Sequence, residues 1–191
     1  GDLIYLQDSV SGKTLDQLPE AEAAFVASNP STGAILSYQG GFNFSKSNFD
    51  RVKQSFPQAG SSFKPFIYSA AIANGYKASD TINDAPIIFE DQNLESAWRP
   101  ENYTGKFYGP IRLREALVQS VNIVSIKLLR ELGIDKAHTF LENFGFPKSR
   151  LAPDLSLALG SSSFSPAEMI RAYNFLANSG EGKNLYFIEK I

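Results

Sequence analysis

Apolar residues recur with two different periods in this chain, and the two periods occupy different parts of it. Residues 23–28 and 34–38 are short apolar runs on either side of the turn-forming residues 29–33, which is the pattern of two strands joined in a hairpin. From residue 63 onward, apolar residues recur mainly at helical spacing. Strands first and helices afterwards predict an α+β domain in which helices pack on one antiparallel sheet.

The same patterns predict the limits of the individual elements. Further strands are expected at 3–7, 87–89 and 186–191, with a polar turn at 8–14. Helices are expected from about 61 to 73 and at 113–119, 123–133, 135–144 and 166–177, where the last begins with the capping-box sequence Ser165-Pro166-Ala167-Glu168.

Composition excludes several classes of function. The 191 residues carry a formal net charge of -2, which gives no sign of a nucleic-acid-binding surface. There is no cysteine, which excludes disulfides and thiolate metal sites. The one histidine, His138, leaves Ser-His catalysis a single candidate base. We expect no cofactor and no metal. No apolar run is long enough to span a bilayer, and no signal peptide is visible.

Ser61 and Lys64 form the strongest candidate for chemistry. They stand three residues apart at the predicted start of a helix, which places the hydroxyl and the amine on one helical face. The amine could then take the proton of the hydroxyl, which would activate a nucleophile without histidine. The alternative is structural, with Ser61 as an N-cap and Lys64 as a solvated first-turn residue.

A second candidate is Ser120-Val121-Asn122, between two predicted helices. If this link is extended, the Ser120 and Asn122 side chains point the same way, because the side-chain period of an extended chain is two. A hydroxyl able to relay a proton and an amide able to bind a peptide would then face one cleft. Alternatively, the two residues only cap the flanking helices.

Ser-x-x-Lys together with a Ser-x-Asn element belongs to the signature of penicillin-binding proteins and class A β-lactamases. Over residues 22–191 the chain resembles the transpeptidase domain of class A, bifunctional penicillin-binding proteins of the 1A type. The resemblance is carried by Asn29–Ala34 with Gly40-Gly41-Phe42, Gly60–Phe66, Trp98–Asn102, Gly109–Arg114 with Ser120–Asn122, and Leu157–Ser161 with Ser165-Pro166 and Ala177–Gly180.

The resemblance implies a serine β-lactamase-like fold and a D,D-transpeptidase that acts on peptidoglycan stem peptides ending in D-Ala-D-Ala. It implies Ser61 as nucleophile, Lys64 as base, Ser120 as proton relay and Asn122 as substrate-binding residue. Trp98 and Tyr103 are candidates for lining the substrate groove. β-Lactams would acylate Ser61. The implied location is the periplasmic face of the inner membrane, with an anchor outside this chain. Since a lysine is mostly charged at pH 7, burial and cationic neighbours must lower the pKa of Lys64.

One departure from the family pattern is that no Lys-Thr-Gly or Lys-Ser-Gly follows Gly180. We therefore expect a fragment that lacks the last strands and is itself a poor catalyst, because the missing strand supplies an oxyanion donor. Residues 1–20 are expected to end an upstream or accessory β-domain, and residues 21–191 to be a partial transpeptidase domain. Two other functions share the motifs: a β-lactam sensor, and a serine β-lactamase, which needs a deacylating glutamate such as Glu142 or Glu168.

Overall fold

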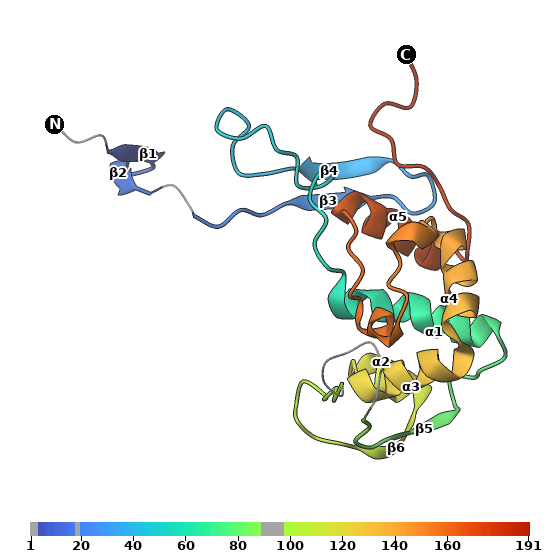
Figure 1. The fold of residues 1–191 in the computed structure, drawn as a ribbon. Helices are drawn as coiled ribbons and strands as arrows, with labels where there is room; N and C mark the ends of the chain where they lie inside the picture. The colour runs from blue at the N-terminus through green and yellow to red at the C-terminus, as the bar shows by residue number, and fades with distance from the viewer. Residues whose placement is uncertain (1–3, 18–19, 89–97) are drawn as a thin grey trace.

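The computed structural model describes residues 4–17, 20–88 and 98–191 (Figure 1). Its strands are β1 (Tyr5–Ser9), β2 (Gly12–Asp16), β3 (Phe25–Ser28), β4 (Ile35–Gln39), β5 (Thr81–Asp84) and β6 (Gly109–Arg112). Its helices are α1 (Lys64–Ala73), α2 (Leu113–Val118), α3 (Asn122–Leu132), α4 (Ile134–Leu141) and α5 (Pro166–Ala177). Short 3-10 turns occupy Gly60–Phe63, Glu142–Phe144, Lys148–Arg150 and Leu155–Leu159. The predicted α+β class is confirmed.

The described strands form three separate antiparallel pairs rather than the one sheet expected, β1 with β2, β3 with β4 and β5 with β6. The hairpin predicted around residues 29–33 is the β3–β4 pair. The predicted turn at 8–14 is wrong, because its second half is β2 and only Val10 and Ser11 connect the paired residues Ser9 and Gly12. Every described residue of β1–β2 is exposed, and the pair lies apart from the helices (Figure 1).

Two other predicted strands are wrong. Ile87 and Ile88 are not in a strand, and Phe89 lies outside the described residues. The strand in this region is β5, where Ile82 and Asp84 alternate inward with exposed neighbours. Residues 186–191 make one parallel bridge, between Tyr186 and Ala34, and continue without regular structure. An apolar pattern does not make a strand where no partner backbone runs alongside it.

The helical predictions hold to within a residue or two at most boundaries. The expected capping box of α5 is present, because Ser165 accepts from the backbone N–H of Glu168 while the Glu168 side chain accepts from the N–H of Ser165. Among the described helices, none combines the length and the apolar character that crossing a bilayer requires.

Helix α1 occupies the centre of the molecule, with α5 and the β3–β4 pair on one side and α2 and α3 on the other (Figure 1). It contacts both α3 and α4. Phe66, Ile67, Ala70 and Ala71 of α1 are fully buried, so burial of most of its surface fixes its position. This arrangement places the first turn of α1 against the start of α3, and the candidate site lies where these two helices begin.

Candidate active site

Ser61 lies on a 3-10 turn that runs directly into α1. The turn is anchored on one side by Phe63, which is fully buried and packs its ring against those of Phe66, Phe146 and Phe164. Ser61 and Ser62 are exposed. The sequence prediction that Ser61 stands at the opening of a helix is therefore confirmed, and the residue is open to solvent.

The backbone of this turn is held from outside α1. The Gly60 N–H donates to the Gly160 carbonyl at 2.9 Å, and the Tyr173 hydroxyl donates to the Ser62 carbonyl at 2.7 Å. A Cβ on Gly160 would lie 2.0 Å from the Gly60 carbonyl oxygen, so only glycine permits this approach. Sequence analysis did not identify Tyr173, since a tyrosine on an amphipathic helix carries no signal of what its hydroxyl contacts.

Lys64 is 1% exposed, and its amine reaches the link between α2 and α3. Nζ donates to the Ser120 carbonyl at 2.7 Å, to the Ser120 hydroxyl at 3.1 Å and to Oδ1 of Asn122 at 2.7 Å. These contacts join residues that are 56 and 58 positions apart in the sequence. The two motifs predicted from sequence therefore meet, and a solvated Lys64 is excluded.

Burial lowers the pKa of Lys64 from 10.5 to about 8. Removal of the amine from water is the cause, and no cationic neighbour among the described residues contributes. Because the pKa of Lys64 is lower in the folded state, holding this lysine in its charged form destabilises the fold near neutral pH, which is typical of a site kept for chemistry rather than for stability. The lowered pKa also leaves roughly a tenth of the molecules with a neutral amine at pH 7.

The link is not extended at Ser120, which was the condition for Ser120 and Asn122 to point the same way by strand alternation. The φ of Ser120 is 53°, in the left-handed region. The Ser120 N–H donates to the Leu117 carbonyl and the Val121 N–H donates to the Ala116 carbonyl, which together make a Schellman motif at the end of α2. Ser120 thus occupies the position usually held by glycine. The side chains of Ser120 and Asn122 both contact the Lys64 amine because the chain reverses direction at Ser120. The alternation of side chains along a strand is not the reason.

The predicted contact between Ser61 and Lys64 is not formed. Among the described residues, the Ser61 hydroxyl has no hydrogen-bond partner, and all three donors of the Lys64 ammonium are directed at Ser120 and Asn122. Proton transfer from Ser61 requires the Lys64 amine to be neutral and to give up one of these hydrogen bonds for one with the Ser61 hydroxyl. Catalytic hydrogen bonds are often open in the free enzyme and close in the substrate complex.

The loop that contains Trp98 and Tyr103 lies beside this cluster, since Nδ2 of Asn122 donates to the Glu101 carbonyl at 2.9 Å. Trp98 is partly buried against the hydrophobic core, whereas Tyr103 is fully exposed. The loop also contributes Asn102, which contacts the start of α3. Asn102 was part of the family resemblance, but its contacts could not be predicted because they span about 20 residues.

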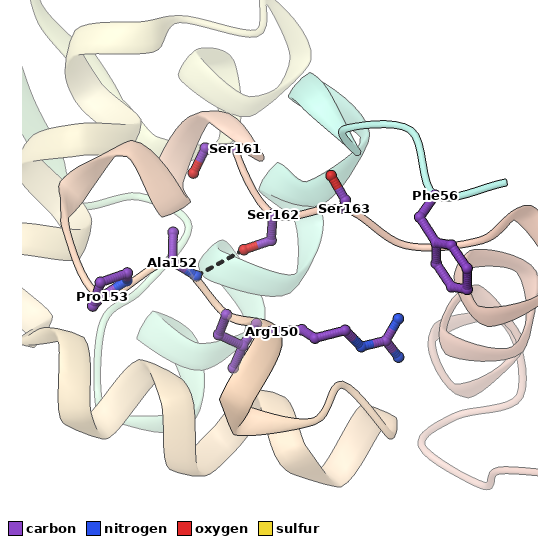
Figure 2. A pocket seen from close by; sticks show the side chains of 8 residues that line it. Phe56, Arg150, Ala152, Pro153, Ser161, Ser162 and Ser163 are labelled. Atoms are coloured by element: carbon purple, nitrogen blue, oxygen red, sulfur yellow. Dashed lines mark hydrogen bonds between the residues drawn. The ribbon is translucent and has the colours of Figure 1, made fainter.

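The cavity shown in Figure 2 has a volume of about 500 Å³, and neither the three candidate catalytic residues nor Asn122 line it. Its lining includes Phe56, Arg150 and the segment Ser161–Ser163, where the Ser162 hydroxyl accepts from the Ala152 N–H at 2.8 Å. The charge of Arg150 is neutralised by Glu168. No group of His, Asp or Glu side chains in residues 4–17, 20–88 and 98–191 is suited to hold a metal ion.

Comparison with known proteins shows the family of the chain. Residues 23–191 match the family of the penicillin binding protein transpeptidase domain. Penicillin-binding protein 1A of Pseudomonas aeruginosa is 47% identical over the whole chain. The crystal structure of penicillin-binding protein 1A from Haemophilus influenzae superimposes on 98% of the chain with a TM-score of 0.91 and 40% identity. The structure of PonA1 from Mycobacterium tuberculosis in complex with penicillin V matches over 90%, with a TM-score of 0.75 and 25% identity.

The chain spans 23% of the length of the Pseudomonas relative, 28% of the Haemophilus structure and 48% of the PonA1 structure. Its likeness to the two 1A proteins extends beyond Ser61 and Lys64 to nearly all of its residues. The match to the transpeptidase domain begins at residue 23, just before β3, and includes every helix described above. The chain therefore belongs to the penicillin-binding protein transpeptidase family.

Proposed function

We propose that this chain carries the acylation residues of a peptidoglycan D,D-transpeptidase, with Ser61 as the nucleophile. The observation that supports this most is the buried Lys64 amine, which lies one helical turn from an exposed serine and contacts Ser120 and Asn122. An amine with a pKa of about 8 is a suitable general base near neutral pH.

In the proposed reaction, Ser61 Oγ attacks the carbonyl carbon between the two D-alanines of a stem peptide, and its proton passes to Lys64. The tetrahedral intermediate collapses, the C–N bond to the terminal D-alanine breaks, and Ser120 passes a proton to the departing amine. The amine of a second stem peptide then attacks the ester, forms the cross-link and releases Ser61. Asn122 binds the substrate amide, and Tyr103 and Trp98 contact the stem peptide.

β-Lactams would acylate the same serine, because their strained amide imitates the terminal dipeptide. The complex of PonA1 with penicillin V supports this extension. The full protein would act on glycan strands derived from lipid II at the periplasmic face of the inner membrane, anchored by a segment outside this chain. Residues 1–20 would then belong to an accessory β-domain or linker, and residues 21–191 to the transpeptidase domain.

A serine β-lactamase is disfavoured by the contacts of Glu168. A deacylating glutamate must be free to activate water, but both carboxylate oxygens of Glu168 contact Arg150, and one also accepts from the Ser165 N–H. Burial alone would raise the pKa of Glu168, yet its bonds to Arg150 and Ser165 outweigh burial and lower it. This carboxylate has a structural role at the start of α5.

Two measurements separate the remaining functions. Both use the intact protein, because residues 1–191 contain no Lys-Thr-Gly element. We expect a penicillin adduct that persists for many minutes by time-resolved mass spectrometry, and new peptide cross-links when lipid II is supplied. Rapid loss of the adduct would favour a β-lactamase. A lasting adduct without cross-links would favour a sensor and contradict the transpeptidase proposal.

Replacing Ser120 by glycine should separate stability from activity. Glycine accepts the left-handed conformation more readily, but S120G also removes the hydroxyl that accepts from the buried Lys64 amine at 3.1 Å, so the free energy of unfolding should change by less than about 1 kcal/mol. Because the same hydroxyl is the relay, β-lactam acylation should slow by about 100-fold.

Ser179 provides the matched control, because its φ is also 53° and α5 ends in the same kind of turn, with the Gly180 N–H donating to the Phe175 carbonyl. S179G removes no such contact, so it should raise the free energy of unfolding by about 0.5–1 kcal/mol and leave the acylation rate within about twofold. Thermal unfolding and stopped-flow acylation provide the two readouts. An S120G variant that acylates at the wild-type rate would remove Ser120 from the mechanism.

A further inference from the structure

The start of α3 carries the candidate residue Asn122 but has no cap of its own. Its N-cap residue is Val121, which makes no side-chain capping bond. The Asn122 N–H instead donates to Oδ1 of Asn102 at 2.9 Å, and the Ile123 N–H donates to the same oxygen at 3.2 Å. Asn102 therefore caps α3 from a loop 20 residues earlier in the sequence.

The orientation of the Asn102 amide is fixed by a buried carboxylate. Asp84, at the end of β5, is fully buried, and Asn102 is 6% exposed. Nδ2 of Asn102 donates to both oxygens of Asp84, at 3.0 and 2.9 Å, and to the Lys106 carbonyl at 2.9 Å. Because these acceptors take the NH₂ end of the amide, Oδ1 must face α3.

Asp84 is in turn held by the backbone. The Tyr108 N–H donates to Asp84 Oδ2 at 2.9 Å, just before β6, which pairs with β5. The contacts thus run from Asp84 through Asn102 to the backbone of Asn122, whose side chain meets the Lys64 amine at 2.7 Å. A buried carboxylate whose hydrogen-bond partners among the described residues are one amide and one backbone N–H is costly unless that amide must be held in one orientation.

We propose that Asn102 and Asp84 are positioning residues for acylation, which hold Asn122 against the amine of Lys64. This inference rests on the proposed function. In the proposed reaction, neither Asn102 nor Asp84 contacts the substrate or gives up a proton. Their effect reaches the reaction through Asn122, because the first backbone N–H of α3 belongs to Asn122 itself. A displacement of about 1 Å at such a site can cost up to about 100-fold in rate.

The test is the second-order rate constant for β-lactam acylation of the intact protein. We expect Asn102→Ala to lower it by about 10- to 100-fold, and to lower it by less than threefold when Asn122 is already alanine. An N102A protein that acylates at the wild-type rate, or one that loses as much in the N122A background, would overturn the proposal.

Lys127 provides the matched control. Its Nζ donates to the Asn83 and Ala85 carbonyls at 2.7 and 3.2 Å, so it also ties α3 to β5, but more than one turn away from Asn122. Lys127→Gln should lower thermal stability while leaving the acylation rate within about threefold. If K127Q slowed acylation as much as N102A, a general loosening of this region would explain both results.

An isosteric pair of variants covers the case in which N102A does not fold. N102D sets a second carboxylate against Asp84 and should slow acylation, whereas the exchange D84N/N102D restores a donor facing an acceptor and should recover part of the loss. Equal rates for the single and the double variant would contradict the pairing.

A further measurement keeps this inference separate from the proposed function. Amide hydrogen exchange at Asn122 and Ile123 should be at least tenfold faster in N102A than in wild type, and unchanged in K127Q. Acylation of a serine other than Ser61 would refute the proposed function and leave this result standing. Unchanged exchange in N102A would refute the capping by Asn102 even if Ser61 is acylated normally.

Discussion

Replacing Ser61 by alanine should abolish the covalent β-lactam adduct of the intact protein. Ser61 is exposed on the turn before α1, and removal of a catalytic nucleophile typically costs several powers of ten in rate. The adduct should therefore fall below detection in intact-mass spectrometry under conditions that fully label the wild type. The fold should be retained, because the Ser61 hydroxyl makes no hydrogen bond among the described residues.

Ser62 is the control for this variant. It is the adjacent exposed serine on the same turn, and its hydroxyl donates to the Ala59 carbonyl rather than facing Lys64. Ser62→Ala should acylate within about threefold of wild type. If S61A retained the adduct and S62A lost it, Ser62 rather than Ser61 would be the nucleophile. The interpretation that Lys64 serves Ser61 would then be wrong.

Replacing Lys64 by methionine should slow acylation by about 10²- to 10⁴-fold, because methionine has similar length but cannot accept a proton. The wild-type rate should rise about tenfold per pH unit below pH 8 and level off above it. The sign follows from the lowered pKa, since the neutral amine that acts as base becomes the major form only above about 8.

Stopped-flow acylation between pH 6 and 9 measures both effects. The K64M variant should lack the inflection near pH 8, although it leaves three acceptors at Ser120 and Asn122 without their donor and so loses some stability. An inflection near pH 8 that persists in K64M would mean that another group is the base. A wild-type rate that falls through this range would contradict the proposed protonation state.

The residues of the candidate site could be proposed from sequence because its two motifs are short and local. Spacing places Ser61 and Lys64 on one helical face, and the helical predictions for α2 and α3 set Ser120 and Asn122 at a helix junction. The conformation of the link could not be predicted in the same way. A serine at a position that usually holds glycine gives no left-handed signal in a single sequence.

The contacts that hold the site were harder to predict, because they join distant segments. Gly160 against Gly60, Tyr173 against Ser62, and Asn102 between Asp84 and α3 depend on how the helices pack, not on local pattern. The strand errors have the same origin. Residues 186–191 are apolar enough for a strand, but whether they form one depends on which backbone lies beside them.

The most direct test of the account is to locate the adduct on the intact protein treated with a β-lactam. Trypsin should release residues 54–77 as one peptide, because Pro65 protects the bond after Lys64, and fragmentation distinguishes its serines at 55, 61, 62 and 69. We predict that the added mass lies on Ser61. An adduct on any other residue would contradict the claim that the Lys64 amine serves this serine.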